Sequence, residues 1–352
     1  MNHLPKTQDV PGTQQQKLPI RAIAPASENH TMELYAVGFN AWNQLLFEPS
    51  MIEDEPDDLF LFKKVLGAEE ISRPRPRLCY TTVHRDGIRC LAGSCPGATI
   101  SLENGENCIF DSLHAISGDG AVLTVAESKL QHGYGPQTLV RYPSVAAWKS
   151  GTDGRSWPCT YPVRQIEAYE TGFVILCEDQ DSPVSTMGDP RFADCLGRDV
   201  DESNPADEPC PVSLLSTLGD PIKKVTAGGF SLAALTEGGA VYIWGAESIG
   251  SHTRYQPFPD ISNTPNYMEV DEEKDVMDVA LGESHGIAIT MDGDVYVVGS
   301  NTNGQLGFGK EFTGVATSWS KADFGVPPGW KSVGVEAGPK SSFILTAEKP
   351  KY

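Results

Sequence analysis

Residues 282–309 read GESHGIAITMDGDVYVVGSNTNGQLGFG, and this stretch decides the fold. Ile287 and Ile289 alternate with smaller or polar residues before the Asp292-Gly293 pair, and a second alternating apolar run follows that pair. Alternation with a period of two on both sides of an Asp-Gly pair is the strongest short-range signal for a hairpin, and a type I′ turn needs two residues that tolerate positive φ. The stretch is therefore predicted to form a β-hairpin.

The same pattern occurs a second time, one repeat earlier in the chain. Residues 235–245 (LTEGGAVYIWG) align one for one with residues 289–299 (ITMDGDVYVVG), and the turn glycines Gly239 and Gly293 are 54 positions apart (293 − 239). A repeat of about fifty residues built only of hairpins indicates a radial array of small sheets, because one small sheet cannot bury its own faces.

One repeat is divided between the two ends of the chain. Residues 38–46 (GFNAWNQLL) align with residues 299–307, the second half of a repeat, whereas residues 337–346 align with residues 281–290, a first half. A blade shared by both ends closes a ring and removes two exposed sheet edges. The sequence therefore predicts an all-β fold, a closed β-propeller with one blade split between the N- and C-termini.

Six repeat units are recognisable, and they centre on Leu34 with Phe343, Asp86, Asp119, Ile175, Leu235 and Ile289. Gly120 follows Gly87 by only 33 positions (120 − 87), which predicts a shortened blade. Residues 172–177 are interpreted as an inner strand, and residues 130–162 leave room for a seventh unit. The expectation is a single propeller of six to seven blades over residues 32–352. Residues 1–31, rich in Pro and Gln, are expected to form a disordered tail.

The composition limits the classes of ligand and compartment. The chain has 352 residues with 47 acidic against 27 basic side chains and a net charge of −20, which argues against nucleic acid as the main ligand. There is no apolar run long enough for a membrane span and no secretory signal pattern, so an intracellular protein, cytoplasmic or nuclear, is expected. The eight cysteines contain no CxxC pair, so we expect reduced thiols and no metal or other cofactor.

These repeats resemble the regulator of chromosome condensation repeat family, in which a Gly-x-x-His start leads to a Gly-x-Asn-x-x-Gly-Gln-Leu-Gly end. The resemblance is closest to small stand-alone members, and it implies a seven-bladed propeller without implying a single activity. His285 is expected to connect neighbouring blades, and Asn301 and Gln305 to satisfy backbone groups of a turn. The predicted structural positions are Gly38, Asn40, Gln44, Gly282, His285, Asp292, Gly293, Gly299, Asn301, Gly304, Gln305 and Gly307.

Acidic insertions are the most distinctive surface feature. They predict either solvated loops or an electronegative face for a basic protein partner. The candidate partner-binding residues are Glu53, Asp54, Asp57, Asp58, Asp271, Glu272 and Glu273. Residues 72–77 (SRPRPR) are the one concentrated basic element, and their alternating prolines favour an extended lead-in to a blade.

Neither a Walker phosphate loop nor a Gly-x-Ser-x-Gly elbow occurs, so the sequence predicts a protein that is not an enzyme. We expect a non-catalytic scaffold or adaptor, a monomer within a larger complex. The resemblance implies either a chromatin-linked adaptor or a partner of the tRNA-modification and diphthamide machinery. The alternative is a guanine-nucleotide exchange factor for a Ran-like small GTPase.

Overall fold

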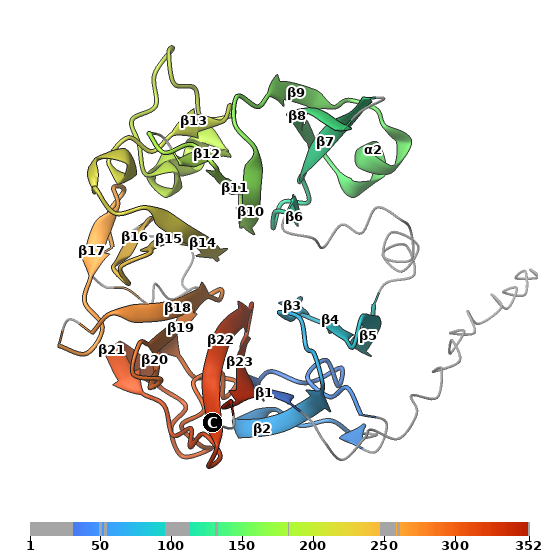
Figure 1. Cartoon of the computed structure of the whole chain (residues 1–352), viewed down its shortest axis with the longest axis vertical. Helices are drawn as coiled ribbons and strands as arrows, with labels where there is room; N and C mark the ends of the chain where they lie inside the picture. The colour runs from blue at the N-terminus through green and yellow to red at the C-terminus, as the bar shows by residue number, and fades with distance from the viewer. Residues whose placement is uncertain are drawn as a thin grey trace, which may run out of the picture.

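The computed structural model describes residues 31–48, 51–52, 55–95, 113–130, 133–181, 183–246, 258, 261–272 and 274–350. Their strands form six sheets arranged radially around a central axis, as Figure 1 shows. The all-β propeller expected from the sequence is thereby confirmed, with six blades in the described part of the chain. No helix in these residues is both long and apolar enough to cross a membrane.

In each sheet the strands are ordered from the axis outward. The first two sheets are β3 (Arg75–Pro76), β4 (Tyr80–Arg85) and β5 (Ile88–Gly93), then β6 (His114–Ile116), β7 (Val122–Leu130), β8 (Gly133–Tyr142) and β9 (Arg155–Pro158). The third and fourth are β10 (Val163–Tyr169), β11 (Gly172–Cys177), β12 (Val184–Gly188) and β13 (Cys210–Pro211), then β14 (Ile222–Gly228), β15 (Ser231–Thr236), β16 (Val241–Gly245) and β17 (Asn266–Met268).

The fifth sheet contains β18 (Val276–Leu281), β19 (His285–Thr290), β20 (Val295–Ser300) and β21 (Val315–Lys321). The sixth contains β22 (Trp330–Gly338), β23 (Ser341–Glu348), β1 (Met32–Gly38) and β2 (Leu59–Ala68). In the described residues three short helices lie between strands: α2 (Val145–Ser150), η2 (Pro190–Leu196) and η3 (Leu215–Thr217).

The sixth sheet is the predicted split blade. β1 from the start of the chain pairs antiparallel with β23 from its end, with Leu34 opposite Leu345 and Ala36 opposite Phe343. The side chains of Leu34 and Phe343 are fully buried in the same hydrophobic cluster. The two halves of the repeat thus meet as the alignment of residues 38–46 predicted.

Residues 172–177 form β11, the second strand from the axis in the third sheet, so the predicted inner strand is one of the two inner strands of its sheet. Two other details of the predicted blade pattern differ in the structure. The Asp119 turn joins β6 to β7, the first and second strands, whereas the Asp86 turn joins β4 to β5, the second and third. The 33-residue spacing between Gly87 and Gly120 therefore separates two different kinds of turn and does not measure the length of a blade. Residues 130–162 form no seventh blade, because β8 and β9 extend the sheet that β6 and β7 begin.

The hairpin of β19 and β20 is confirmed, but its turn is not of type I′. The amide of Gly293 donates to the carbonyl of Thr290 at 2.9 Å, and of the loop residues only Gly293 (φ 92°) has a positive φ. This is a three-residue loop that ends in a left-handed glycine. The type I′ geometry occurs instead at Asp86 (φ 52°) and Gly87 (φ 73°).

Packing between neighbouring sheets supplies the core. Trp244, the largest fully buried side chain, lies in a cluster shared by the third and fourth sheets, and its Nε1 donates to the carbonyl of Cys195 at 3.1 Å. The turns between second and third strands, such as those at Gly87, Gly239 and Gly293, lie on one face of the ring, because equivalent strands run in the same direction in every blade. We call this the hairpin face.

Candidate functional site at the mouth of the central channel

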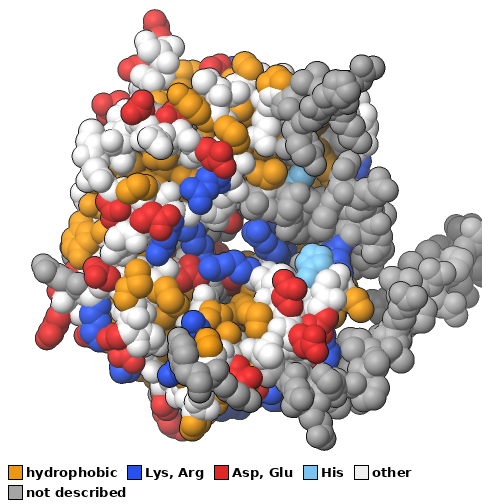
Figure 2. All heavy atoms as spheres, in the orientation of Figure 1, with side chains coloured by type: hydrophobic (Ala, Val, Ile, Leu, Met, Phe, Trp, Pro, Cys, Tyr) orange, Lys and Arg blue, Asp and Glu red, His pale blue; other side chains and the backbone are white. Residues whose placement is uncertain are grey.

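Basic side chains gather around the central opening of this acidic protein, as Figure 2 shows. A hollow of about 370 Å³ lies there, lined mainly by residues of the innermost strands. Its cations, which we call the channel-mouth cluster, are Arg73, Arg75, Arg164, Lys223 and Lys224. Arg164 and Lys223 lie near the N-terminal ends of β10 and β14. These ends are on the hairpin face, so the channel-mouth cluster opens toward that face.

A buried carboxylate neutralises two of these cations. Asp278 Oδ2 lies 2.7 Å from a guanidinium nitrogen of Arg73, and its Oδ1 lies 2.8 Å from Lys224 Nζ. The amide of Val335 also donates to Oδ2, at 2.9 Å. Burial by itself would raise the pKa of Asp278, but Lys224 and Arg73 hold that pKa below its usual value. The carboxylate therefore joins four blades through β18, β14, β22 and the segment before β3.

Arg164 and Lys223 are not neutralised in this way. Neither side chain makes an ion pair or hydrogen bond with any residue that the structure describes. Arg75, between these extremes, has only a 3.6 Å contact with the carboxylate of Glu167. Two unpaired cations that line one hollow repel each other, and an anion placed between them would relieve that repulsion.

A repeated backbone irregularity brings Arg164 and Lys223 to the opening. The pairing of β10 with β11 skips Arg164 between Val163 and Gln165, and the pairing of β14 with β15 skips Lys223 in the same way. Met277 and Val333 are skipped at the equivalent places of β18 and β22. A β-bulge redirects the side chain of its extra residue. Two adjacent blades thus use a common bulge to present a cation, and two others use it for an apolar residue.

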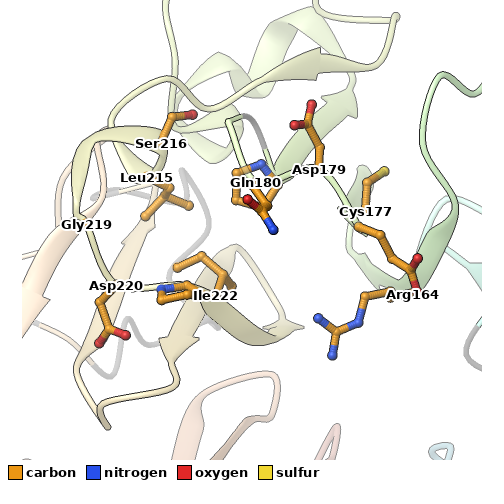
Figure 3. A pocket seen from close by; sticks show the side chains of 12 residues that line it. Arg164, Cys177, Asp179, Gln180, Leu215, Ser216, Gly219, Asp220 and Ile222 are labelled. Atoms are coloured by element: carbon orange, nitrogen blue, oxygen red, sulfur yellow. The ribbon is translucent and has the colours of Figure 1, made fainter.

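A second pocket, of about 560 Å³, adjoins the channel-mouth cluster and also includes Arg164. Figure 3 shows the guanidinium of Arg164 well apart from the carboxylates of Asp179 and Asp220. Glu178 lines the pocket too, and it is not paired with Arg164 either. This neighbouring hollow between the third and fourth sheets therefore has an acidic rim beside the basic channel mouth.

The predicted acidic residues are not gathered into one patch. Asp57 pairs with Lys310 at 2.8 Å, and this hydrogen bond lowers the pKa of Asp57. Asp58 accepts the amide of Asn40 at 2.9 Å, close to the start of β2. Asp271 instead accepts a short hydrogen bond from the hydroxyl of Tyr296, beside the β19–β20 hairpin, and this bond is the main cause of its lowered pKa.

The two acidic groups therefore lie at opposite ends of the strands. Glu272 is exposed, with a positive φ of 58°. Glu53, Asp54 and Glu273 lie outside the described residues.

The predicted repeat residues lie in the turns on the face opposite the hairpins or at the strand ends beside those turns, except Asp292 and Gly293. Asn301 Oδ1 accepts the amide of Leu306 at 2.8 Å, and Gln305 Oε1 accepts the amide of Asn303 at 2.9 Å. In the split blade Asn40 and Gln44 accept the amides of Leu45 and Trp42 at 3.1 and 2.9 Å. Among the predicted repeat glycines, φ lies between 74° and 114° at Gly38, Gly293, Gly299, Gly304 and Gly307.

His285 and Gly282 form a tight contact between the fifth and sixth sheets. Nε2 of His285 lies 3.2 Å from the carbonyl oxygen of Ser341 and 3.1 Å from the hydroxyl of Ser342. A Cβ added at Gly282 would lie 2.1 Å from Cε1 of His285, so only glycine fits beside the ring. Asp292, at the other end of β19, accepts a short hydrogen bond from Thr290 and pairs with Lys274 at 3.2 Å.

Sequence reasoning missed the channel-mouth cluster. Residues 72–77 were visible as a basic run, and the structure uses them as an extended segment that becomes β3. Arg164 and Lys223 carried no such signal, because each is one cation near the start of an ordinary strand. The two cations can be recognised as equivalent only after the repeats are aligned on their innermost strands, where both occupy the same bulge position. Among the described residues, no three His, Cys, Asp or Glu side chains are placed to hold a metal ion.

Comparison with known proteins agrees with this architecture. Residues 276–305 match the Regulator of chromosome condensation (RCC1) repeat. The chain is 31% identical over 157 residues to the Regulator of chromosome condensation of Mus musculus, a match covering 44% of this chain and 35% of the mouse protein. It is 34% identical over 134 residues to the human E3 ubiquitin-protein ligase HERC2, covering 38% of this chain and 3% of HERC2.

Solved structures extend the likeness to the whole ring. Prp20p from Saccharomyces cerevisiae superposes with a TM-score of 0.62 at 12% identity, over 92% of this chain and 93% of Prp20p. Human WBSCR16 superposes with a TM-score of 0.50 at 17% identity, over 91% of this chain and 85% of that protein. The repeat match and the six blades of the described residues together support a β-propeller that contains a regulator of chromosome condensation repeat.

Proposed function

We propose that this propeller is a non-catalytic scaffold or adaptor that binds a protein partner on its hairpin face, in the nucleus or the cytoplasm. The observation that carries the proposal is the pair of unpaired cations, Arg164 and Lys223, at the channel mouth. Both cations lie at bulges of paired strands, so little backbone freedom is lost when a partner binds. Charge complementarity of this kind sets the orientation and specificity of a partner.

Relatives give this proposal a precedent. The structure of Prp20p was determined together with its binding properties to Gsp1p and histones, and a second structure contains Kap60 bound to yeast RCC1. Both share the fold with this chain at 12% identity, so they support protein binding by analogy of fold alone. A chromatin-linked adaptor and a partner of the tRNA-modification machinery are both compatible with that analogy.

The test is affinity capture of the tagged protein from its native cells after brief crosslinking, with mass spectrometry as the readout. Three chains are compared: the native chain, Arg164→Gln with Lys223→Gln, and a control with Lys63→Gln and Arg191→Gln. The control removes the same charge from two exposed positions outside the channel-mouth cluster. We expect a stoichiometric partner that the control retains and the channel-mouth variant loses. A partner retained equally by all three would contradict the proposal.

The acidic loops offer a competing binding surface within the same experiment. Glu272 is exposed and Asp271 is partly neutralised by Lys274, 3.3 Å away. A variant with Asp271→Lys and Glu272→Lys tests them directly. Loss of the partner in this variant alone would move the binding site to the acidic face and indicate a basic partner.

The second candidate function is guanine-nucleotide exchange on a Ran-like small GTPase. The 31% identity to the mouse Regulator of chromosome condensation favours it, although the match covers only 35% of that protein. Recovery of a small GTPase that stays bound only without nucleotide would support exchange. The absence of accelerated nucleotide release at micromolar protein would exclude this candidate.

A further inference from the structure

We propose that the channel mouth binds an acidic segment of a protein, with Arg164 and Lys223 receiving its carboxylates. This inference rests on the proposed function and specifies the chemistry of the partner. It identifies a site that the repeat pattern does not encode, because the bulge positions that present these cations are occupied by Met277 and Val333 in other blades.

The charges at the channel mouth fall into a neutral set and an unpaired set. Arg73 and Lys224 share Asp278 and Glu336, with contacts of 2.7 to 3.6 Å, so two cations face two carboxylates. Arg75 is offset by Glu167.

What remains is the pair Arg164 and Lys223, which form no ion pair in the described residues. The exposed Glu237 lines the same hollow, and Glu178, Asp179 and Asp220 line the adjoining pocket. The position of the two cations offers two donors to an incoming carboxylate. The geometry therefore fits an anion of the ligand.

The ring holds these two cations in place through neighbouring groups. Gln165, next to Arg164, bridges to the next blade: its amide donates to the carbonyl of Val225 at 2.9 Å, and its oxygen accepts the amide of Val225 at 3.1 Å. Lys224, next to Lys223, is fixed by Asp278. Each free cation is thus adjacent in sequence to a residue that joins two blades, so the separation of the two bulges is set by the ring.

A short acidic segment fits the surroundings better than a nucleic acid does. Glu178, Asp179 and Asp220 line the adjoining pocket, and the net charge of the whole chain is −20. An extended phosphate backbone would be repelled by this rim, because its affinity requires many neutralising contacts along its length. A segment with a few carboxylates can place them on Arg164 and Lys223 while the rest of the segment extends away from the acidic rim.

The experiment measures binding of a fluorescein-labelled hexaglutamate peptide to the full chain by fluorescence polarisation. An acidic protein should repel this probe unless a local basic site exists. We expect binding that weakens with added salt. Arg164→Gln with Lys223→Gln should weaken it by about tenfold or more, as loss of a charge-assisted contact implies. The control Lys63→Gln with Arg191→Gln should bind within about twofold of the native chain.

Other outcomes would overturn the inference. Equal weakening in the control variant would mean that net charge, not the channel mouth, governs binding. Tighter binding of a labelled single-stranded oligonucleotide than of hexaglutamate would make the site one for phosphate chains. If the peptide fails to bind but the captured partner is still lost in the channel-mouth variant, the acidic ligand is wrong and the proposed function stands. The channel-mouth variant should keep the native melting temperature, because neither of its side chains has a partner in the described residues. The control should keep it as well, because the ion pair that it removes, Arg191 with Asp189, is exposed at Arg191 and contributes little.

Discussion

At the scale of single residues, His285 shows how a repeat side chain couples two blades. The carbonyl oxygen of Ser341 can only accept a hydrogen bond, so Nε2 of His285, 3.2 Å away, carries the proton. Nδ1 is buried and has no hydrogen-bond partner in the described residues. Complete burial therefore lowers the pKa of His285 to about 4, although the bond to Ser341 opposes the shift.

The lowered pKa predicts acid sensitivity. Because the unfolded chain binds a proton near pH 6.5 and the folded chain only near pH 4, stability is lost as pH falls through this window. The loss should be about 2 kcal/mol at pH 5. His285→Gln keeps an N–H donor but does not titrate. Between pH 7 and pH 5 its free energy of unfolding should therefore fall by about 2 kcal/mol less than that of the native chain. Urea unfolding at both pH values measures the difference.

The matched control is the exposed His84. His84→Gln should follow the native chain at both pH values, because its backbone pairing does not involve the imidazole. If the native chain and His285→Gln lose stability in parallel as the pH falls, the imidazole of His285 is not the acid-sensitive group.

At the scale of elements, the innermost strands act together through Asp278. Its carboxylate on β18 holds Lys224 of β14 and Arg73 before β3, and it is itself buried. Asp278→Asn would leave both cations without their main counter-charge, and we expect a loss of about 3 kcal/mol in the free energy of unfolding. Urea unfolding at pH 7 measures this loss. Asp57→Asn, which breaks an exposed pair with Lys310, should leave the midpoint unchanged. Equal shifts in the two variants would show that Asp278 does not connect the blades.

The same elements show what sequence could predict. The β19–β20 hairpin and the split blade were visible, because side-chain alternation and the Gly-x-Asn pattern are local. The bulges at Arg164 and Lys223 were not, because a residue is skipped only relative to the strand beside it. The nearness of Arg73 to Asp278 was also hidden, since only a closed ring brings residues so distant in sequence together. The fold could thus be read from local patterns, whereas the candidate site depends on closure.

At the scale of the whole molecule, closure depends on β23. This strand lies between β22 and β1, and it is paired along its length with both. Deleting residues 341–352 removes it, exposes the edges of β22 and β1, and opens the ring within the sixth sheet. We therefore expect the truncated chain to lose the cooperative thermal transition of the native protein, followed by circular dichroism and by near-ultraviolet signals.

The control for this deletion is removal of residues 350–352 alone, which leaves β23 intact. Its transition should match that of the native chain. A peptide of residues 339–352 added to the longer truncation should restore the transition, because β22 and β1 then regain their common partner. An unchanged transition without the peptide would mean that the blades are held by contacts between neighbours and that closure contributes little. The channel mouth would then be a property of separate blades, and its cations would not need the ring to stay together.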